Sequence, residues 1–325
     1  MKAAVMLKPN VLSIQEVPVP DVEDDEVLIE VHASGLCGSD LHIFRGHRSD
    51  VTFPHISGHE ASGKVAKVGA KVTRVKVGDR VAVEPNFGCG VCEICRRGTT
   101  NLCFSKKTLG LNLPGCFAEY VKAPERYVWP IPDTMSYLEG ALVEPATVAV
   151  HAVNHADIEI GDKVLVLGAG PIGLLILQCA KLAGGEVTVV DVAKPRLEIA
   201  KELGADRVSD GRDLAARAFD RVIDAAGVSA TLNLGLKSLK PGGTLVLVGL
   251  GGEPLTFDGM VLVRQEIKLK GIVACSDEFP RTIELVAKGK INVKALANYT
   301  LKLEEVEQGL KLMEDKVAIK PVIFI

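Results

Sequence analysis

The sequence predicts an α/β protein of two domains, one a doubly wound parallel sheet and the other a barrel-like set of antiparallel strands. Three observations support this prediction. The chain has 325 residues, more than one hydrophobic core of ordinary size usually organises. Its first part carries short alternating runs, whereas strands and helices alternate from about residue 148 onward. A glycine-rich turn stands between the first strand and the first helix of that second part.

Short runs of alternating hydrophobicity mark the strands of residues 1–147. They are Val27 to Val31, Gly63 to Val68 and Arg80 to Val83, with a turn signal at Gly78-Asp79 between the last two. A period of two is typical of strands with one buried face, so we expect an antiparallel, barrel-like domain.

Residues 148–276 alternate between apolar strands and helices. The expected strands are Lys163 to Leu167, Val187 to Val190, Arg221 to Ile223 and Thr244 to Val248. The expected helices are Ile172 to Leu182 and Lys194 to Leu203, the second of them ended by Gly204. This order is typical of a parallel sheet covered by helices on both faces.

Residues 277–325 are too few for a domain of their own. Their pattern predicts a helix over Pro280 to Lys288, a short strand, a helix over Leu303 to Met313 and a final strand over Pro321 to Ile325. We expect this part to rejoin the first domain, which then comprises residues 1–147 and 277–325, while residues 148–276 form the second domain.

Composition excludes several classes of function. Charged residues make up 24% of the chain and the net charge is -3, with no long run of either sign, so a nucleic-acid or membrane-surface partner is not expected. No stretch approaches the roughly 20 apolar residues of a membrane span, and Pro9 interrupts an N-terminal run too short for a secretion signal. The 8 cysteines then indicate a reducing compartment, where clustered cysteines more often bind metal than form disulfides. We therefore expect a cytoplasmic protein.

The turn Gly168-Ala169-Gly170-Pro171-Ile172-Gly173 fits the G-x-G-x-x-G pattern of dinucleotide sites. It follows an expected strand and begins an expected helix, which is the context a Rossmann fold requires. Gly168 permits the tight turn, Gly170 lets a pyrophosphate approach the backbone, and Gly173 lets helix and strand pack closely. The phosphates would meet the free N–H groups at the helix N-terminus. The alternative is a Rossmann-like turn that binds some other ligand.

Asp191 lies 18 residues beyond Gly173, at the end of the next expected strand. Its carboxylate would accept hydrogen bonds from the adenosine ribose and repel a 2′-phosphate, so NAD is predicted in preference to NADP. Arg196, just over one helical turn further on, either contacts the ribose or pyrophosphate or is an ordinary solvated arginine.

Four cysteines, Cys89, Cys92, Cys95 and Cys103, form the pattern C-x2-C-x2-C-x7-C. Four thiolates within 15 residues suit a closed tetrahedral zinc site, and glycines at 88, 90 and 98 permit the chain reversals that it needs. A closed site has no position for substrate, so the lobe of residues about 88–104 is expected to hold a structural zinc. An iron–sulfur cluster is the alternative. Three further cysteines stand alone and are expected in the core: Cys116, Cys179 and Cys275.

A second set of metal-ligand residue types is spread along the chain. Cys37 precedes His59 and Glu60 by about twenty residues, and Glu144 follows much later. A thiolate, an imidazole and a carboxylate from separated segments can hold zinc with one position open for substrate, although single residues of these types are usually structural.

These pieces together resemble the zinc-containing medium-chain dehydrogenase/reductase family of the alcohol dehydrogenase superfamily, and within it the sorbitol (polyol) and threonine dehydrogenase branch. The matching segments follow the family's order: Cys37-Gly38-Ser39-Asp40-Leu41-His42, Gly58-His59-Glu60-Ala61-Ser62-Gly63, the four-cysteine lobe, Glu144-Pro145 and the glycine turn. The resemblance implies a GroES-like first domain, a Rossmann second domain, two zinc ions per chain and NAD.

The resemblance also implies the ligands of the catalytic zinc. They are Cys37 and His59, with either Glu60 or Glu144 as the third, and Asp40 would orient the histidine. Zinc lowers the pKa of bound water from 15.7 to about 7, and a similar drop for a bound alcohol would yield the zinc-bound alkoxide that hydride transfer needs.

Further roles follow from the same resemblance. Ser39 would accept the alcohol's proton and pass it to His42, which relays it to solvent. Glu60 would either ligate the zinc or hold its water, and Ile172 would press on the nicotinamide. The remaining histidines have no motif support and are expected to be ordinary: His32, His47, His55, His151 and His155.

The predicted function is a zinc-dependent oxidoreductase that transfers a hydride between a secondary alcohol or polyol and NAD. Alternatives within the family are dehydrogenases of an aldose, a sugar phosphate or L-threonine. The cysteine lobe and the Cys37–His59 pair argue against a zinc-free quinone reductase. Intact Ser39, His42 and Glu60 argue against a non-catalytic NAD- or zinc-binding homologue. The only partner expected besides the small-molecule substrate is the chain itself, as a homotetramer or a dimer.

One departure from the branch concerns the substrate. Ala274 and Cys275 stand where its polyol dehydrogenases usually carry an Arg-Tyr pair. A bidentate donor for vicinal hydroxyls is therefore missing, and we expect sorbitol to be a poorer substrate than short secondary alcohols, vicinal diols or a differently held polyol. Phe44, Arg45 and His47 either supply replacement contacts or form a surface loop beside the cleft.

Overall fold

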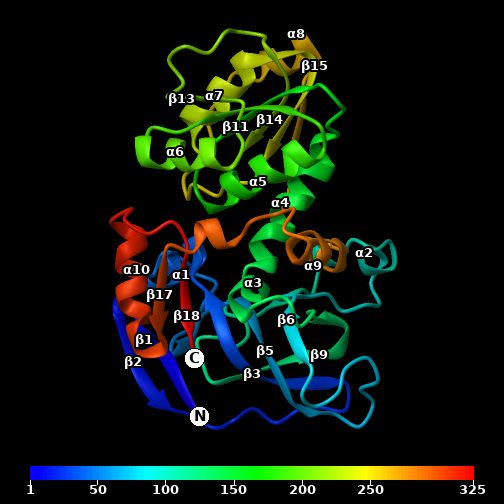
Figure 1. The fold of residues 1–325 in the computed structure, drawn as a ribbon, viewed down its shortest axis with the longest axis vertical. Coiled ribbons are helices and arrows are strands. Elements are labelled where there is room, and N and C mark those ends of the chain that lie inside the picture. Colours follow the sequence, from blue (N-terminus) through cyan, green and yellow to red (C-terminus); the bar gives the residue numbers. More distant parts are fainter. The chain divides into compact units, whose positions relative to one another are not determined.

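The computed structural model describes residues 1–325, which divide into two compact units (Figure 1). The first unit comprises Met1–Glu144, Phe279–Lys288 and Val293–Ile325, and the second comprises Pro145–Glu278 and Gly289–Asn292. The C-terminal part of the chain therefore belongs to the first unit. No helix has both the length and the apolar character needed to cross a membrane.

The main sheet of the first unit has the strand order β10-β6-β5-β3-β18-β17, and β9 also pairs with β3. All its pairs are antiparallel except β17 with β18. Its strands are β3 (Glu26–Gly35), β5 (Glu60–Val68), β6 (Arg80–Val83), β9 (Tyr120–Pro124), β10 (Val128–Pro130), β17 (Tyr299–Lys302) and β18 (Pro321–Phe324). Central β3 buries apolar side chains such as Val27, Ile29 and Val31, which anchor one hydrophobic core.

Smaller elements complete the first unit. A second sheet has the order β2-β1-β4, and β7 pairs with β8. The bounds of these strands are β1 (Lys2–Lys8), β2 (Val11–Glu16), β4 (His55–Ile56), β7 (Asn86–Phe87) and β8 (Lys107–Thr108). The helices are α1 (Gly38–Phe44), α2 (Glu93–Arg96), α3 (Tyr137–Ala141), α9 (Phe279–Ala287) and α10 (Val306–Glu314), the last preceded by a 3-10 turn over Leu303–Glu305.

The second unit contains a six-stranded sheet in the order β13-β12-β11-β14-β15-β16, in which every pair is parallel. Its strands are β11 (Lys163–Leu167), β12 (Glu186–Val190), β13 (Arg207–Ser209), β14 (Phe219–Asp224), β15 (Leu239–Leu247) and β16 (Lys268–Gly271). The accompanying helices are α4 (Val143–Ala156), α5 (Pro171–Leu182), α6 (Lys194–Glu202), α7 (Ser229–Ser238) and α8 (Met260–Gln265). In chain order this is the 3-2-1-4-5-6 arrangement of a Rossmann sheet, with its topological switch between β11 and β14.

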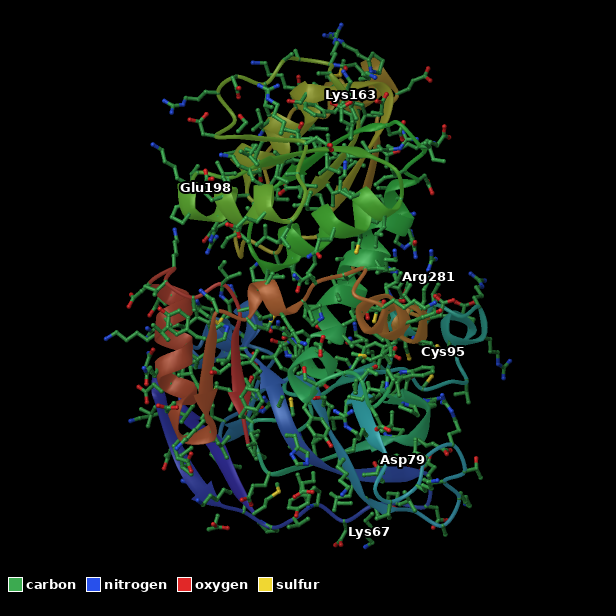
Figure 2. The ribbon with its side chains drawn as sticks, viewed as in Figure 1. Lys67, Asp79, Cys95, Lys163, Glu198 and Arg281 are labelled. Atoms are coloured by element: carbon green, nitrogen blue, oxygen red, sulfur yellow. The ribbon has the colours of Figure 1, made fainter.

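The two edge strands of this sheet, β13 and β16, were not predicted from the sequence. β13 has three residues, and β16 exposes most of its side chains, so neither forms an apolar run. The labelled side chains of Figure 2 help to locate the units: Asp79 and Cys95 belong to the first, and Lys163 begins β11 of the second.

Candidate metal centres and cofactor site

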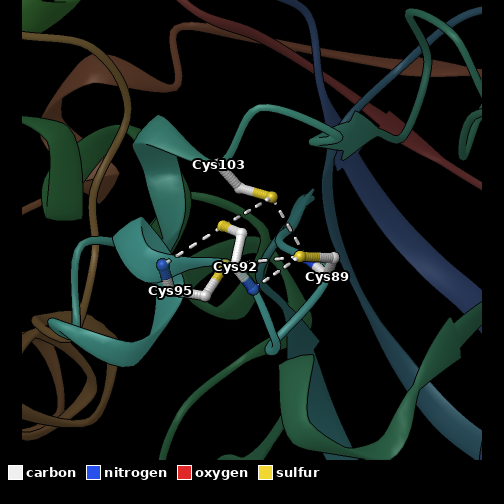
Figure 3. A group of neighbouring side chains, drawn as sticks. All are labelled: Cys89, Cys92, Cys95 and Cys103. Atoms are coloured by element: carbon white, nitrogen blue, oxygen red, sulfur yellow. Dashed lines mark hydrogen bonds between the residues drawn. The ribbon is translucent and has the colours of Figure 1, made fainter.

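The four cysteines of the lobe converge on one point (Figure 3). Their sulfur atoms all lie within 4.8 Å of one another, with 4.0 Å between Cys89 and Cys95 and 3.9 Å between Cys92 and Cys103. A zinc tetrahedron with bonds of about 2.3 Å requires sulfur–sulfur separations of about 3.8 Å. All four thiols are free of disulfides. The cluster therefore fits a zinc ion held by four sulfur ligands.

The backbone of the lobe points N–H groups at these sulfur atoms. Sγ of Cys92 accepts a hydrogen bond from the N–H of Cys95 at the start of α2, and Sγ of Cys89 accepts one from the N–H of Cys92, both at 3.4 Å. Such donors favour the thiolate, so the N–H groups of Val91 and Cys92 lower the pKa of the Cys89 thiol to about 6. Burial has the opposite effect on Cys95, whose pKa rises to about 11. A cation bound to the four sulfur atoms would favour the thiolate form of all four cysteines.

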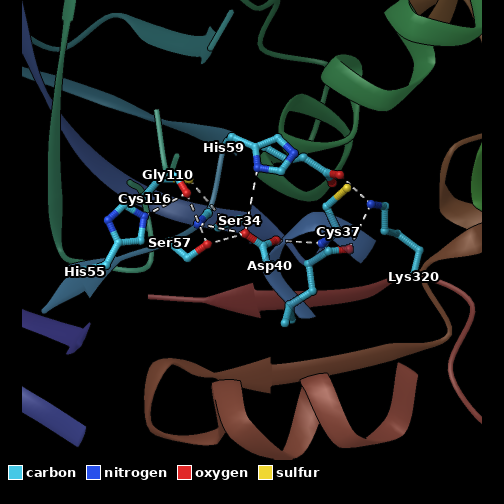
Figure 4. Close-up of polar contacts among 12 residues, drawn as sticks. Ser34, Cys37, Asp40, His55, Ser57, His59, Gly110, Cys116 and Lys320 are labelled. Carbon is cyan, nitrogen blue, oxygen red and sulfur yellow. Dashed lines mark hydrogen bonds and ion pairs between the residues drawn. The ribbon is translucent and has the colours of Figure 1, made fainter. Parts of the chain in front are cut away.

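Strand register brings the second group of donors together (Figure 4). β5 and β18 flank β3, and Gly35 at the end of β3 pairs with Glu60 on one side and with Val322 on the other. Cys37 follows this point by two residues, and His59 directly precedes Glu60. The candidate ligand atoms of Cys37, His59 and Glu60 therefore lie within 4.8 Å of one another.

Asp40 joins the two loops that carry these donors. It is fully buried, and its Oδ2 accepts the N–H of Cys37 at 2.8 Å. Its Oδ1 accepts the hydroxyl of Ser57 at 2.5 Å and the N–H of Gly58 at 3.0 Å. The distance from Oδ1 to Nδ1 of His59 is 3.8 Å, longer than a hydrogen bond. Asp40 thus holds the loops on both sides of the centre rather than the imidazole alone.

Three polar atoms around this centre are buried without a hydrogen-bond partner: Nδ1 of His59, Oε2 of Glu60 and Oγ of Ser39. An unpaired buried polar atom costs about 1–3 kcal/mol, so Oε2 of Glu60 and Oγ of Ser39 call for a ligand, whereas Nδ1 of His59 lies toward Asp40. The backbone also makes room for the carboxylate, because a Cβ added at Gly35 would lie 2.0 Å from Oε2 of Glu60. The residues present therefore fit a metal ion.

The two candidates for the third ligand differ in position. Glu60 groups with Cys37 and His59, whereas Glu144 falls outside that group of ligand atoms. Glu144 lies in the first turn of α4 and is buried, and this burial raises its pKa to about 7. A carboxylate of this kind can exchange a proton near neutral pH.

Lys320 is a site residue that sequence reasoning missed. Its ammonium donates to the carbonyl oxygen of Leu36 at 2.9 Å and to Oε1 of Glu60 at 2.5 Å, and the side chain is buried. The available signal was a single cation within the otherwise apolar run from Ala318 to Phe324. Because charged side chains are rarely buried without a partner, such a lysine indicates a buried carboxylate elsewhere.

Ser39 and His42 both lie on α1. Ser39 is half-buried, and His42 is exposed one turn further along, with its ring 5.9 Å from that of His47. No direct hydrogen bond joins Ser39 to His42, since Oγ of Ser39 has no partner. Proton transfer between them would need an intervening group.

The glycine turn has the geometry that its sequence pattern predicts. Gly168 follows β11 with φ +96, a conformation that glycine favours. A Cβ at Gly173 would lie 1.8 Å from the carbonyl oxygen of Gly168, so only glycine permits this close contact. Nothing lies within 4 Å of a Cβ at Gly170, which begins α5 as its N-cap without a side-chain cap. The turn thus leaves open space and free N–H groups at a helix N-terminus, as a pyrophosphate requires.

Asp191 follows β12 and contacts the same turn. Its Oδ2 accepts the N–H of Ala169 at 2.7 Å, and its Oδ1 accepts the N–H of Ala193 at 2.8 Å. The carboxylate therefore has a fixed orientation and retains acceptor capacity for ribose hydroxyls. Ile172 and Arg196 are both half-buried, and the Arg196 guanidinium makes no ion pair.

Comparison with known proteins extends these observations. The model of the alcohol dehydrogenase GroES-like domain matches residues 23–133, and that of zinc-binding dehydrogenases matches residues 171–288. Sorbitol dehydrogenase of Bacillus subtilis is 38% identical over 96% of this chain and 93% of that protein.

Two solved structures cover 100% of this chain and 99% of their own. The 2R,3R-butanediol dehydrogenase of Bacillus subtilis is 32% identical with a TM-score of 0.91. An Escherichia coli protein described as a short chain alcohol dehydrogenase, in complex with NADH, is 33% identical with a TM-score of 0.94.

The chain belongs to the zinc-containing medium-chain dehydrogenase/reductase family. The predicted combination of a GroES-like domain and a Rossmann domain is thereby confirmed. Within that family the protein is a zinc-dependent, NAD-linked dehydrogenase of the alcohol and polyol class, as the sequence predicted.

Proposed function

We propose that this enzyme oxidises short secondary alcohols, vicinal diols or small polyols with NAD, at a zinc ion held by Cys37, His59 and Glu60. The observation that carries the assignment is the convergence of these three donors, with Oε2 of Glu60 left unpaired. When bound there, zinc supplies the Lewis acidity that lowers the pKa of a substrate hydroxyl.

The remaining polar residues would handle the proton and the substrate. Oγ of Ser39, buried and unpartnered, would accept the hydroxyl proton, and exposed His42 would release it to solvent. Glu144, buried beside His59 and Glu60, would supply a second carboxylate, which its raised pKa suits to holding a proton. Asp191 and Arg196 would contact the adenosine half of NAD, with Gly168, Gly170 and Gly173 around the pyrophosphate and Ile172 beside the nicotinamide.

The cysteine lobe would hold a second, structural zinc through Cys89, Cys92, Cys95 and Cys103. Its sulfur separations match a tetrahedral site, and all four coordination positions would be filled by protein. Such a site gives no access to substrate, so its contribution is to the folding of the lobe.

The preference for small substrates rests on Ala274 and Cys275. Alanine has no polar side-chain atom and a cysteine thiol is a single weak donor, so neither Ala274 nor the buried Cys275 offers a bidentate donor for two adjacent hydroxyls. Among the relatives, one is named for sorbitol and another for 2R,3R-butanediol, and the missing donor favours the second kind of substrate.

The test compares kcat/KM with NAD for 2-butanol, 2,3-butanediol, xylitol, sorbitol, glucose, a sugar phosphate and L-threonine. We expect 2,3-butanediol to exceed sorbitol by at least about tenfold, or about 1.4 kcal/mol. A preference for sorbitol would refute the argument from Ala274, and activity with glucose, the sugar phosphate or L-threonine alone would replace the proposed substrate class.

Cys37→Ser should abolish turnover yet keep NADH binding, because Cys37 and the glycine turn belong to different units.

We also propose that the enzyme is a cytoplasmic homotetramer. The clustering of four cysteines in a metal-type lobe supports a reducing compartment, and the assembly is the family expectation. Sedimentation equilibrium would distinguish a tetramer from a dimer.

A further inference from the structure

A buried ion pair lies outside both candidate metal centres. Nδ1 of His151, on α4, donates to Oε1 of Glu278 at 2.6 Å, and Nδ2 of Asn154 donates to the same oxygen at 3.4 Å. Both members of the pair are buried, with 6% and 8% of their surfaces exposed. No motif includes His151, so it was assigned no role from the sequence.

The other carboxylate oxygen of Glu278 holds the preceding turn of the backbone by two hydrogen bonds. Oε2 accepts the N–H of Ser276 at 2.9 Å and the N–H of Asp277 at 3.2 Å. Just before this stretch, Ala274 adopts φ +53, which a residue with a Cβ does only when its neighbours hold it there. Glu278 thus fixes a turn and at the same time ties it to α4.

That turn follows directly from the sheet of the second unit. β16 ends at Gly271, so residues 272–278 leave the sheet at the carboxyl ends of its parallel strands. Ligands of open α/β sheets bind along this edge, where the glycine turn and Asp191 also lie. The conformation of residues 272–278 therefore shapes one wall of the edge that receives the cofactor.

Helix α4, which carries His151, also carries Glu144. α4 is one continuous helix with Glu144 in its first turn and His151 seven residues further on. Seven residues make nearly two helical turns, so both side chains lie on the same face, about 10.5 Å apart along the axis. Whatever fixes the rotation of α4 at His151 also fixes the direction of Glu144.

We propose that His151 and Glu278 are a positioning pair, which fixes the direction of Glu144 through helix α4 and holds the conformation of the cofactor-side segment 272–278. This inference rests on the proposed function, because it assigns Glu144 to the reaction. A buried ion pair adds little net stability compared with apolar packing, but it tolerates few alternative arrangements. A buried pair of this kind is thus suited to alignment.

The test uses His151→Gln, Glu278→Gln and the double variant of the zinc-loaded enzyme. Glutamine nearly matches the volume of glutamate, so Glu278→Gln removes the charge and keeps the shape. Glu198→Gln is the matched control, because Glu198 forms an exposed pair with Lys201 on α6. For each protein, kcat, KM, the primary deuterium isotope effect with a deuterated diol, the dissociation constant of NADH and the thermal midpoint are measured.

We expect each single variant to lower kcat at least about tenfold and to raise the isotope effect, because misalignment slows hydride transfer. The double variant should be no worse than either single one, since both remove the same constraint. The NADH dissociation constant should rise in all three, and Glu198→Gln should behave as wild type.

Variants that lose only thermal stability, with kcat, isotope effect and NADH affinity unchanged, would overturn the proposal and leave a purely structural pair. Additive losses in the double variant would also contradict it. If the wild type oxidises none of the alcohols, the proposed function fails instead, and the change in NADH affinity still decides whether the pair shapes the cofactor edge.

Discussion

Lys320 and Glu60 are separated by 260 positions in the sequence, yet Nζ of Lys320 lies 2.5 Å from Oε1 of Glu60. Both are nearly inaccessible to solvent, with 3% and 1% of their surfaces exposed. The contact arises because β18 and β5 pair with opposite sides of β3. One carboxylate oxygen therefore neutralises the lysine while the other, Oε2, remains unpaired and available to a metal ion.

Replacing Lys320 should lower the free energy of unfolding, because Lys320 is the counter-ion of a buried carboxylate. In the zinc-free protein, Lys320→Met leaves the Glu60 carboxylate buried without its counter-ion, which typically destabilises a protein by about 3–5 kcal/mol. Urea unfolding measures the change. Lys288→Met is the control, because Lys288 pairs with Glu284 at the surface and should shift stability by less than about 0.5 kcal/mol. Equal effects of the two substitutions would contradict the buried pair.

The two proposed zinc ions should differ in lability. The lobe would surround its ion with four sulfur ligands, of which Cys95 and Cys103 are buried, whereas the other centre would have a position open to substrate. A chelator should therefore remove activity before it changes the circular dichroism spectrum. Metal analysis should give two zinc ions per chain before treatment and one after loss of activity. A single ion before treatment, or simultaneous loss of activity and fold, would contradict this.

Asp191 should determine the preference for NAD over NADP. Asp191→Asn removes the charge that repels a 2′-phosphate while keeping an acceptor oxygen for the N–H of Ala169 or Ala193. The ratio of kcat/KM for NAD to that for NADP should fall by at least about tenfold, or about 1.4 kcal/mol. Asp210→Asn, at an exposed pair with Arg212, should leave the ratio unchanged. A wild type that already prefers NADP would refute the assignment.

Acid should weaken the contribution of Glu278 to stability. Burial alone would raise its pKa, but hydrogen bonds from His151 and from the N–H of Ser276 lower it from 4.5 to about 2. A carboxylate with a lowered folded-state pKa stabilises the fold above its unfolded-state value and loses that contribution as the pH falls toward the folded-state value.

The free-energy difference between wild type and Glu278→Gln should therefore stay constant above about pH 5 and shrink from there toward pH 2. Urea unfolding of the two proteins in parallel at each pH measures it, and the comparison cancels acid effects that both share. A difference independent of pH would show that Glu278 acts by its shape alone.

Features encoded within a short stretch of chain could be predicted from the sequence. The four cysteines of the lobe fall within 15 residues, and the glycine turn lies between the strand and the helix that it joins. In both cases the backbone conformation and the ligand geometry depend on neighbours a few positions away. The alternation of β11, α5, β12 and α6 could also be predicted, because buried strands and amphipathic helices each impose a characteristic period on the apolar residues.

Tertiary structure alone decided which distant residues meet. The grouping of Glu60 rather than Glu144 with Cys37 and His59 depends on the register of β3 with β5, and the contact of Lys320 with Glu60 depends on the pairing of β18. The pairing of His151 with Glu278 likewise depends on where the chain returns from β16. None of these contacts has a local pattern, because strand pairing and helix packing can join any two segments. A sequence can show that a buried charge needs a partner, but only the packed fold identifies that partner.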